Sequence, residues 1–311
     1  MAQVTAALAP TIQQAGPSRL VRVGRWARRN PVTALGFAIV LTLAALGALA
    51  PLLAPYDPYA LNPGTVLDGP SRSHLFGTGL FGEDIFSRAL YGIRIDFAIG
   101  LGAVAVGLVL GASVGAVAGY LGGRTDEILM RLMDIVAAFP GFILAMGIAG
   151  ALGPSIPNLI VAIAMVNVPV YARLMRARFL IIRTSQYALA ATGVGASRWR
   201  ILSWHLLPNS VAPIFVQSTL QVGWAILDAA GLSFIGLGVQ LPTPEWGVMV
   251  SLGVPRIMSG QWWVSLFPGI FIAITVMGFN LIGDGLQDLL DPARRCGGGA
   301  EGRRGSGVVR R

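Results

Sequence analysis

The chain has 311 residues, of which 54% are hydrophobic and 12% charged, and its formal net charge is +9. A soluble domain of this length carries about twice that share of charged residues. The apolar runs are continuous and do not alternate with polar residues, which excludes a β-barrel and predicts an all-α membrane protein. All 23 basic residues are arginines, so the chain lacks the lysine that a Walker A ATP site requires.

No motif for metal binding or covalent catalysis occurs in the sequence. The two histidines, His74 and His205, are far apart, and Cys296 is the only cysteine. Without an HExxH, CxxC or Cys/His cluster, we expect no metal site, no catalytic residues and no disulfide. The net charge would suit nucleic acid, but the placement of the arginines gives a better explanation.

Hydropathy divides the chain into five parts. Residues 1–30 are a basic segment, and the uncharged run that follows predicts a first transmembrane helix over residues 31–53. That run is too long for a signal peptide. Residues 54–96 form a proline-containing polar loop, residues 97–292 a core of five further helices, and residues 293–311 a disordered basic tail.

Five apolar segments make up the predicted core, which brings the total to six transmembrane helices. The Gly153-Pro154 pair and Pro157 split one long uncharged stretch into two of them. The predicted spans cover residues 97–121, 127–152, 158–175, 211–235 and 263–283.

Four glycines in the second span stand four residues apart, on one face of a helix: Gly107, Gly111, Gly115 and Gly119. Small residues at this spacing let another helix approach closely. The alternative is that glycine is simply frequent in membrane helices.

Arginines are distributed unequally between the two sides of a six-span topology. One side carries 19, in the N-terminal segment, the 121–131 turn, the 173–206 segment and the tail; the other side carries four. The positive-inside rule then places both termini in the cytoplasm.

A polar, glycine-broken insert, YALAATGVGASRWRILSWHLLPNS, separates the fourth and fifth spans. We expect one short helix over residues 187–192, a turn at Gly195, and a second helix over residues 198–207 that Ser197 caps and Pro208 ends. Trp199, Leu202 and Leu206 would share one face of the second helix. Such a helix pair could dock a soluble partner, anchor at the membrane surface, or serve only as a linker.

The insert resembles the EAA loop of ABC-importer permeases. The matching residues are Ala190, Ala191, Gly195, Ile201, Leu207 and Pro208. Further segments resemble the C-type permease subunit of dipeptide and oligopeptide importers, and together they cover residues 54–292: HLFGT at 74–78, RLMDIVAAFPG at 131–141, LSFIGLGVQLPTPEWG at 232–247 and FNLIGDGLQDLLDP at 279–292.

The resemblance implies a multi-pass permease of the bacterial inner membrane. It would form the substrate pathway with a second, B-type permease, receive substrate from an extracytoplasmic binding protein, and couple to two ATPase subunits through residues 187–208. ATP and magnesium would be bound by those ATPases, and no cofactor or nucleic acid by this chain. The chain departs from the family pattern at Leu189, where glutamate is usual, at Gly79, where an acidic residue is usual, and at Glu83, where arginine is common.

Two aspartates fall inside predicted spans, where ionisable groups are costly. Asp134 either lines the pathway or lies at the interface near Arg131, and Asp228 either lines the pathway or forms a buried polar contact. The segment 236–260, which includes Glu245, either meets the binding protein or is a structured loop.

Rival interpretations differ in substrate or in class. The same family imports nickel chelates, glutathione and opines as well as peptides. An ion-coupled secondary transporter favours inverted repeats and broken mid-membrane helices, which the sequence does not clearly have. A membrane enzyme would need a nucleophile–base or metal constellation, and none is found.

Overall fold

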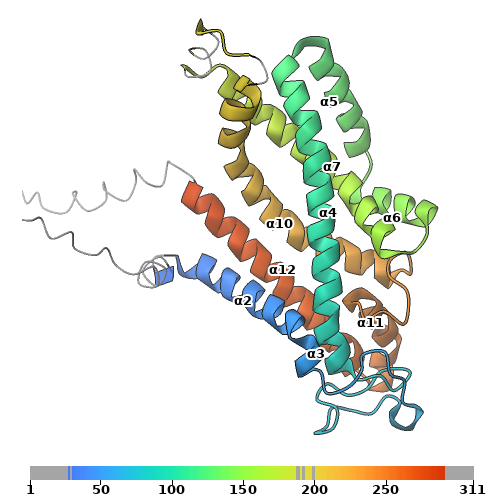
Figure 1. The fold of residues 1–311 in the computed structure, drawn as a ribbon. Helices are drawn as coiled ribbons and strands as arrows, with labels where there is room; N and C mark the ends of the chain where they lie inside the picture. Colours follow the sequence, from blue (N-terminus) through green and yellow to red (C-terminus); the bar gives the residue numbers. More distant parts are fainter. Residues whose placement is uncertain (1–26, 29, 187–189, 191–192, 198–199, 291–311) are drawn as a thin grey trace, which may run out of the picture.

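The computed structural model describes residues 27–28, 30–186, 190, 193–197 and 200–290 of the chain. These residues form a helical bundle without β-strands, which confirms the all-α class. The long helices are α2 (Pro31–Ala48), α4 (Ile85–Leu121), α5 (Gly123–Ala137), α6 (Gly141–Leu152), α7 (Ile156–Arg183), α10 (Leu207–Phe234) and α12 (Trp263–Leu290) (Figure 1). The short ones are α3 (Ala50–Leu53), α11 (Trp246–Gly253), and the 3-10 helices Pro63–Thr65 and Val254–Ser259.

Five of the described helices are long and apolar enough to cross a membrane: α2, α4, α7, α10 and α12. The α5–α6 pair is bent by 86° and makes a sixth span if the two helices cross together. The bundle has two ends. We call the end that carries the described residues between α7 and α10 the insert end, and the opposite end, with residues 54–84 and 235–262, the loop end (Figure 1).

The second span begins twelve residues earlier than the sequence predicts, at Ile85 instead of residue 97. Asp84 caps the helix, because its Oδ2 accepts the amide of Ser87 at 2.8 Å. Two of the charged residues that suggested a loop, Arg88 and Asp96, lie inside α4 with partners elsewhere in the chain. Arg88 donates to the carbonyl of Pro58 at 2.9 Å, and Asp96 accepts the amide of Trp246 at 3.3 Å.

The predicted span over residues 127–152 is wrong as a single helix. Pro140 is the N-cap of α6, and its ring excludes the preceding residue from helical geometry, so the chain turns sharply there. The charged residues gather on α5, and α6 is almost entirely apolar. The break therefore separates a polar helix at the insert end from an apolar one.

The remaining spans lie where predicted but are longer. α7 extends past the predicted end at residue 175 to Arg183, although Pro169 lies inside it. α12 runs on to Leu290. α10 starts at Leu207, with Pro208 in its first turn, so Pro208 begins this helix and does not end the preceding one. Pro208 has no amide hydrogen to donate, and the turn before it is a π-helix in which the amide of Leu207 donates to the Leu202 carbonyl.

The most extensive contact in the bundle joins α4 to α7. The glycine face of α4 lies against the backbone of α7, where a Cβ atom on Gly111 would be 2.4 Å from the Val168 carbonyl oxygen. A Cβ on Gly115 would be 2.1 Å from that of Ala172. Gly107 and Gly119 face α7 in the same way. These glycines therefore leave room for α7 to approach α4 closely.

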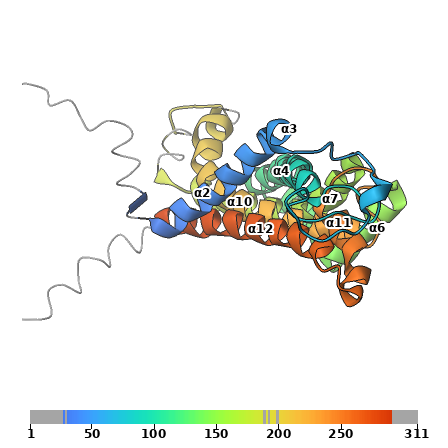
Figure 2. The same ribbon diagram turned by 90° about the horizontal axis from the view of Figure 1, so that it is seen from below.

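The first part of α2 packs against the last part of α12, and the two helices diverge from there (Figure 2). Gly36 of α2 packs against the backbone of Ile282, and Gly278 of α12 packs against Ile39. Because Gly285 also meets Thr33, the start of α2 lies beside the end of α12. The described chain therefore begins and ends on the same side of the bundle, that of the insert end.

Candidate functional site

The segment between α7 and α10 is a helical turn, a glycine and a second helical stretch. The amide of Val194 donates to the carbonyl of Ala190 at 3.1 Å, and Gly195 has a φ of +80°. The hydroxyl of Ser197 accepts the amide of Arg200 at 3.4 Å, as an N-cap residue does. The positive φ at Gly195 is a conformation that favours glycine, so this residue sets the angle between the two stretches.

The second stretch continues directly into α10. Residues Ile201–Leu206 form a π-helix whose end meets the first residue of α10, Leu207. Ile201 and Leu206 are buried in the core of the bundle, and Trp204 on the other side of the turn is 77% exposed. Val194 in the preceding turn is 86% exposed. The segment therefore has an inner side held by the bundle and apolar side chains that project from it.

The sequence-predicted coupling residues are divided between these features. Ala190 and Gly195 are exposed, Ile201 is buried, and Leu207 and Pro208 are exposed in the first turn of α10. Among the residues that the sequence singles out, Leu189, Ala191 and Trp199 lie outside the described part of the chain, as does most of the expected first helix over residues 187–192.

Arginines of α7 hold the α4–α5 turn at the insert end. Arg176 pairs with Asp126 through two contacts, one of them 2.7 Å between Nη2 and Oδ2, and Arg183 donates to the Gly119 carbonyl at 3.1 Å. Arg173 pairs with Asp134 at 2.9 Å. α5 is therefore fastened along α7 by charged contacts.

The two aspartates predicted for the pathway have different surroundings. In its pair with Arg173, Asp134 has a side chain that is 58% exposed in this single chain. Asp228 is half-buried on α10, and no hydrogen bond or ion pair joins it to a described residue. The same helix, α10, makes a buried polar contact with α7. Gln221 of α10 donates to Asn167 of α7 at 2.7 Å, and both side chains are buried.

The loop end is built around the HLFGT segment. His74 contacts Asp84 at 2.9 Å and stacks on Tyr56, so the cap of α4 is also the anchor of the loop. Two departures from the family pattern meet here. Glu83 is buried and accepts the amide of Phe81 at 2.7 Å, and a Cβ atom on Gly79 would lie 2.5 Å from its Oε1. Glu83 thus fills the space that a side chain at position 79 would need.

Sequence reasoning missed one cluster at the loop end. Asp96 of α4 and Glu245, the N-cap of α11, are both fully buried, and Trp246 beside them is fully buried too. The sequence predicts that Asp96 ends the polar loop over residues 54–96, and that the segment of Glu245 either meets the binding protein or is a structured loop. Nothing local in either stretch indicates that the two carboxyl groups meet.

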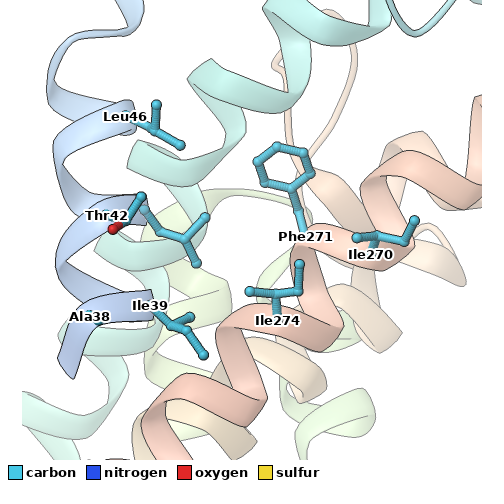
Figure 3. A pocket seen from close by; sticks show the side chains of 8 residues that line it. Ala38, Ile39, Thr42, Leu46, Ile270, Phe271 and Ile274 are labelled. Atoms are coloured by element: carbon cyan, nitrogen blue, oxygen red, sulfur yellow. The ribbon is translucent and has the colours of Figure 1, made fainter. Parts of the chain in front are cut away.

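Two cavities between the described helices are lined mainly by apolar side chains. One of about 420 Å³ lies between α2 and α12, with Thr42 its single polar lining residue (Figure 3). Another of about 580 Å³ is enclosed by α2, α4, α7, α10 and α12. Neither is lined by an ionisable side chain, so neither could bind the charged ends of a peptide.

Residues 107–295, which include the glycine face, the α7–α10 segment and both aspartates, match the family of binding-protein-dependent transport system inner membrane components. The chain belongs to this permease family. Residues 18–70 match the N-terminal transmembrane domain of oligopeptide transport permease C. The permease is accordingly a multi-pass membrane subunit of an ABC importer.

Curated relatives cover most of the permease. A dipeptide transport system permease protein of Alkalihalophilus pseudofirmus is 45% identical over 85% of this chain and 87% of its own length. A probable D,D-dipeptide transport system permease protein of Escherichia coli is 45% identical over 85% and 88%. A glutathione transport system permease protein of Pectobacterium atrosepticum is 40% identical over 86% and 89%.

Proposed function

We propose that this permease is the C-type subunit of an importer of dipeptides or oligopeptides. It would form the pathway with a B-type permease, receive substrate from an extracytoplasmic binding protein and be driven by two ATPase subunits. The dipeptide permeases at 45% identity and the match to the oligopeptide permease N-terminal domain support the substrate class. The chain itself would hydrolyse no ATP, since it has no lysine for a Walker A loop.

The coupling role is supported by the α7–α10 segment, which exposes apolar side chains, is held to the core and continues into α10. Val194 and Trp204 expose apolar surface at the tip of the segment, which is typical of a contact site for a partner protein. Ile201 and Leu206 hold the same segment to the core. Because it runs without interruption into α10, a push on the segment would move that helix as a rigid body.

We further propose that the insert end is cytoplasmic, together with both termini. Six arginines of α5 and α7 lie in parts of these helices toward this end, and Arg200 lies in the segment itself; the six are Arg124, Arg131, Arg173, Arg176, Arg178 and Arg183. The four arginines that the sequence assigns to the opposite side lie at the loop end or in the first turns of α4 beside it; they are Arg72, Arg88, Arg94 and Arg256. The distribution agrees with the positive-inside rule.

The experiment compares two glycines of the segment. Gly193 and Gly195 both have open space around a built Cβ, but only Gly195 has a positive φ. Gly195→Asp should reduce uptake at least tenfold while the protein still reaches the membrane, because the strained backbone changes the angle between the stretches. Gly193→Asp adds the same charge without backbone strain and should retain most of the uptake.

Co-purification of the ATPases distinguishes two failures. Loss of the ATPases from the Gly195→Asp complex would place the defect in docking, and their retention without uptake would place it in transmission. Normal uptake by this variant would reject a coupling role for the turn and leave a membrane-surface linker.

Glutathione is the second candidate substrate, because a glutathione permease is 40% identical over most of the chain. Glutathione is itself a small peptide, so the two candidates differ in recognition and not in chemical class. Competition between unlabelled glutathione and a labelled dipeptide for uptake would separate them.

A further inference from the structure

Two carboxyl groups meet in the interior of the loop end, between α4 and α11. Asp96 and Glu245 are each 0% exposed, and the residue after Glu245 is hydrogen-bonded to Asp96, because the amide of Trp246 donates to Asp96 Oδ2 at 3.3 Å. Both oxygens of Glu245 are used by the first turn of α11, since Oε1 accepts the amide of Gly247 at 3.0 Å and Oε2 that of Val248 at 2.8 Å.

One carboxyl oxygen of Asp96 has no hydrogen-bond donor among the described residues. The Oδ2 of Asp96 accepts the amide of Trp246 at 3.3 Å, but no donor reaches the fully buried Oδ1. An ionised carboxylate can only accept hydrogen bonds, so contact between two of them is repulsive. The same contact becomes a hydrogen bond when one carboxyl carries a proton. The Oδ1 of Asp96 then has a hydrogen-bond partner.

No basic group takes the place of that proton. Arg88 on α4 donates to the Pro58 carbonyl, and Arg94 on the same helix is exposed. Among the described residues, the titratable group that acts on each carboxyl is the other carboxyl, and the Ser233 hydroxyl of α10 is the remaining polar side chain on Glu245. α11 carries no charged residue, and Asp284 and Asp288 of α12 lie toward its other end.

We propose that Asp96 and Glu245 hold one proton between them, and that this proton fastens α11 to α4. The proton converts a repulsive pair into a contact that closes over Trp246, whose indole Nε1 donates to the Ala89 carbonyl at 3.0 Å. Gly92 leaves room for that ring, because a Cβ there would lie 2.7 Å from Nε1.

The direction of pH sensitivity follows from burial. Burial raises the pKa of Glu245, and the amides of Val248 and Gly247 oppose the rise. A carboxyl whose pKa is raised in the folded state stabilises the fold at low pH, and that contribution is lost as the pH rises through the folded pKa. The contact between α11 and α4 therefore loosens on the alkaline side.

Infrared spectroscopy detects the proton directly. At neutral pH the purified full-length permease, with the subunits that accompany it, should show the carbonyl band of a protonated carboxyl that Asp96→Asn removes. The asparagine amide donates to Glu245 without a proton, so the variant should fold. Asp57→Asn, which changes an exposed loop carboxylate, should leave the band unchanged. An identical band in wild type and Asp96→Asn would overturn the shared proton.

Thiol labelling tests the fastening. In a Cys296→Ser background, Val248→Cys places a thiol on α11 at a site that is 7% exposed, and Met258→Cys supplies a 94% exposed reference. Asp96→Ala should raise the labelling rate of the first thiol relative to the second by about tenfold or more, since a buried charged hydrogen bond is lost. Asp96→Asn should change the ratio less than about twofold. If Asp96→Ala leaves the ratio unchanged, the pair does not fasten α11.

Discussion

Replacing Gly115 by alanine should weaken the contact between α4 and α7 more than the size of one methyl group suggests. The new Cβ would lie 2.1 Å from the carbonyl oxygen of Ala172, and 2.9 Å from the Cα and carbonyl carbon of that residue. Ordinary contacts of a Cβ atom are 3.4–4 Å. Because the obstacle is backbone, no change of rotamer relieves it, and the two helices must separate by about 1 Å.

The expected cost follows from the loss of packing along that interface. Overpacking of this kind costs about 1–3 kcal/mol, and the better helix propensity of alanine returns up to about 1 kcal/mol. Gly147→Ala is the matched control, because Gly147 is inside α6 and has nothing within 4 Å of a built Cβ. The control should be neutral or slightly stabilising, and because both variants gain the same helix propensity, they should differ by the overpacking cost of about 1–3 kcal/mol.

The free energy of unfolding in mixed micelles, titrated with a denaturing detergent, measures this difference. Both variants carry the same chemical change in a helix, so their comparison cancels effects on the unfolded chain. A Gly115→Ala protein as stable as Gly147→Ala would refute the inference that the glycine face sets the distance between α4 and α7.

Three further predictions concern topology, ATP hydrolysis and the loop end. A reporter fused after Arg295 should be cytoplasmic and one inserted at Thr65 external; finding both on one side would contradict an even number of crossings. The permease purified alone should hydrolyse no ATP above the level of a mock preparation, and hydrolysis that survives further purification would refute its dependence on partner ATPases. Gly79→Asp should destabilise the protein by about 1–3 kcal/mol, because the new side chain collides with buried Glu83 and adds a second negative charge. Adding Glu83→Arg should recover most of that loss in a double-mutant cycle, and additive effects would show that the two positions do not interact.

Much of the fold was predictable because membrane helices depend on local composition. The uncharged runs over residues 31–53, 97–121 and 263–283 each fall on one long helix, α2, α4 and α12, since a chain in lipid must satisfy its own backbone hydrogen bonds. The spacing of the α4 glycines indicated a close helix contact before its partner was known. Proline was less informative: Pro140 breaks a span, Pro169 lies inside one, and Pro208 starts one.

The candidate site was predictable to a smaller extent. The glycine turn at Gly195 and the cap at Ser197 are local features, so the sequence indicated both, and the structure has a φ of +80° at the first and a hydrogen bond at the second. The continuity of the segment with α10 was not indicated, because Pro208 can either end a helix or begin one.

The environment of a charged residue could not be predicted from the sequence where its hydrogen-bond partner is distant in the chain. The sequence by itself determined the membrane class, the apolar helices and the unequal distribution of arginines, since these follow from residue type and spacing. Only the tertiary structure decided that Asp96 lies inside a helix and meets Glu245, because its partner amide, that of Trp246, is 150 residues away. A buried carboxyl group is tolerated only where other groups supply its hydrogen bonds, and those groups are brought together by the packing of α4, α10 and α11.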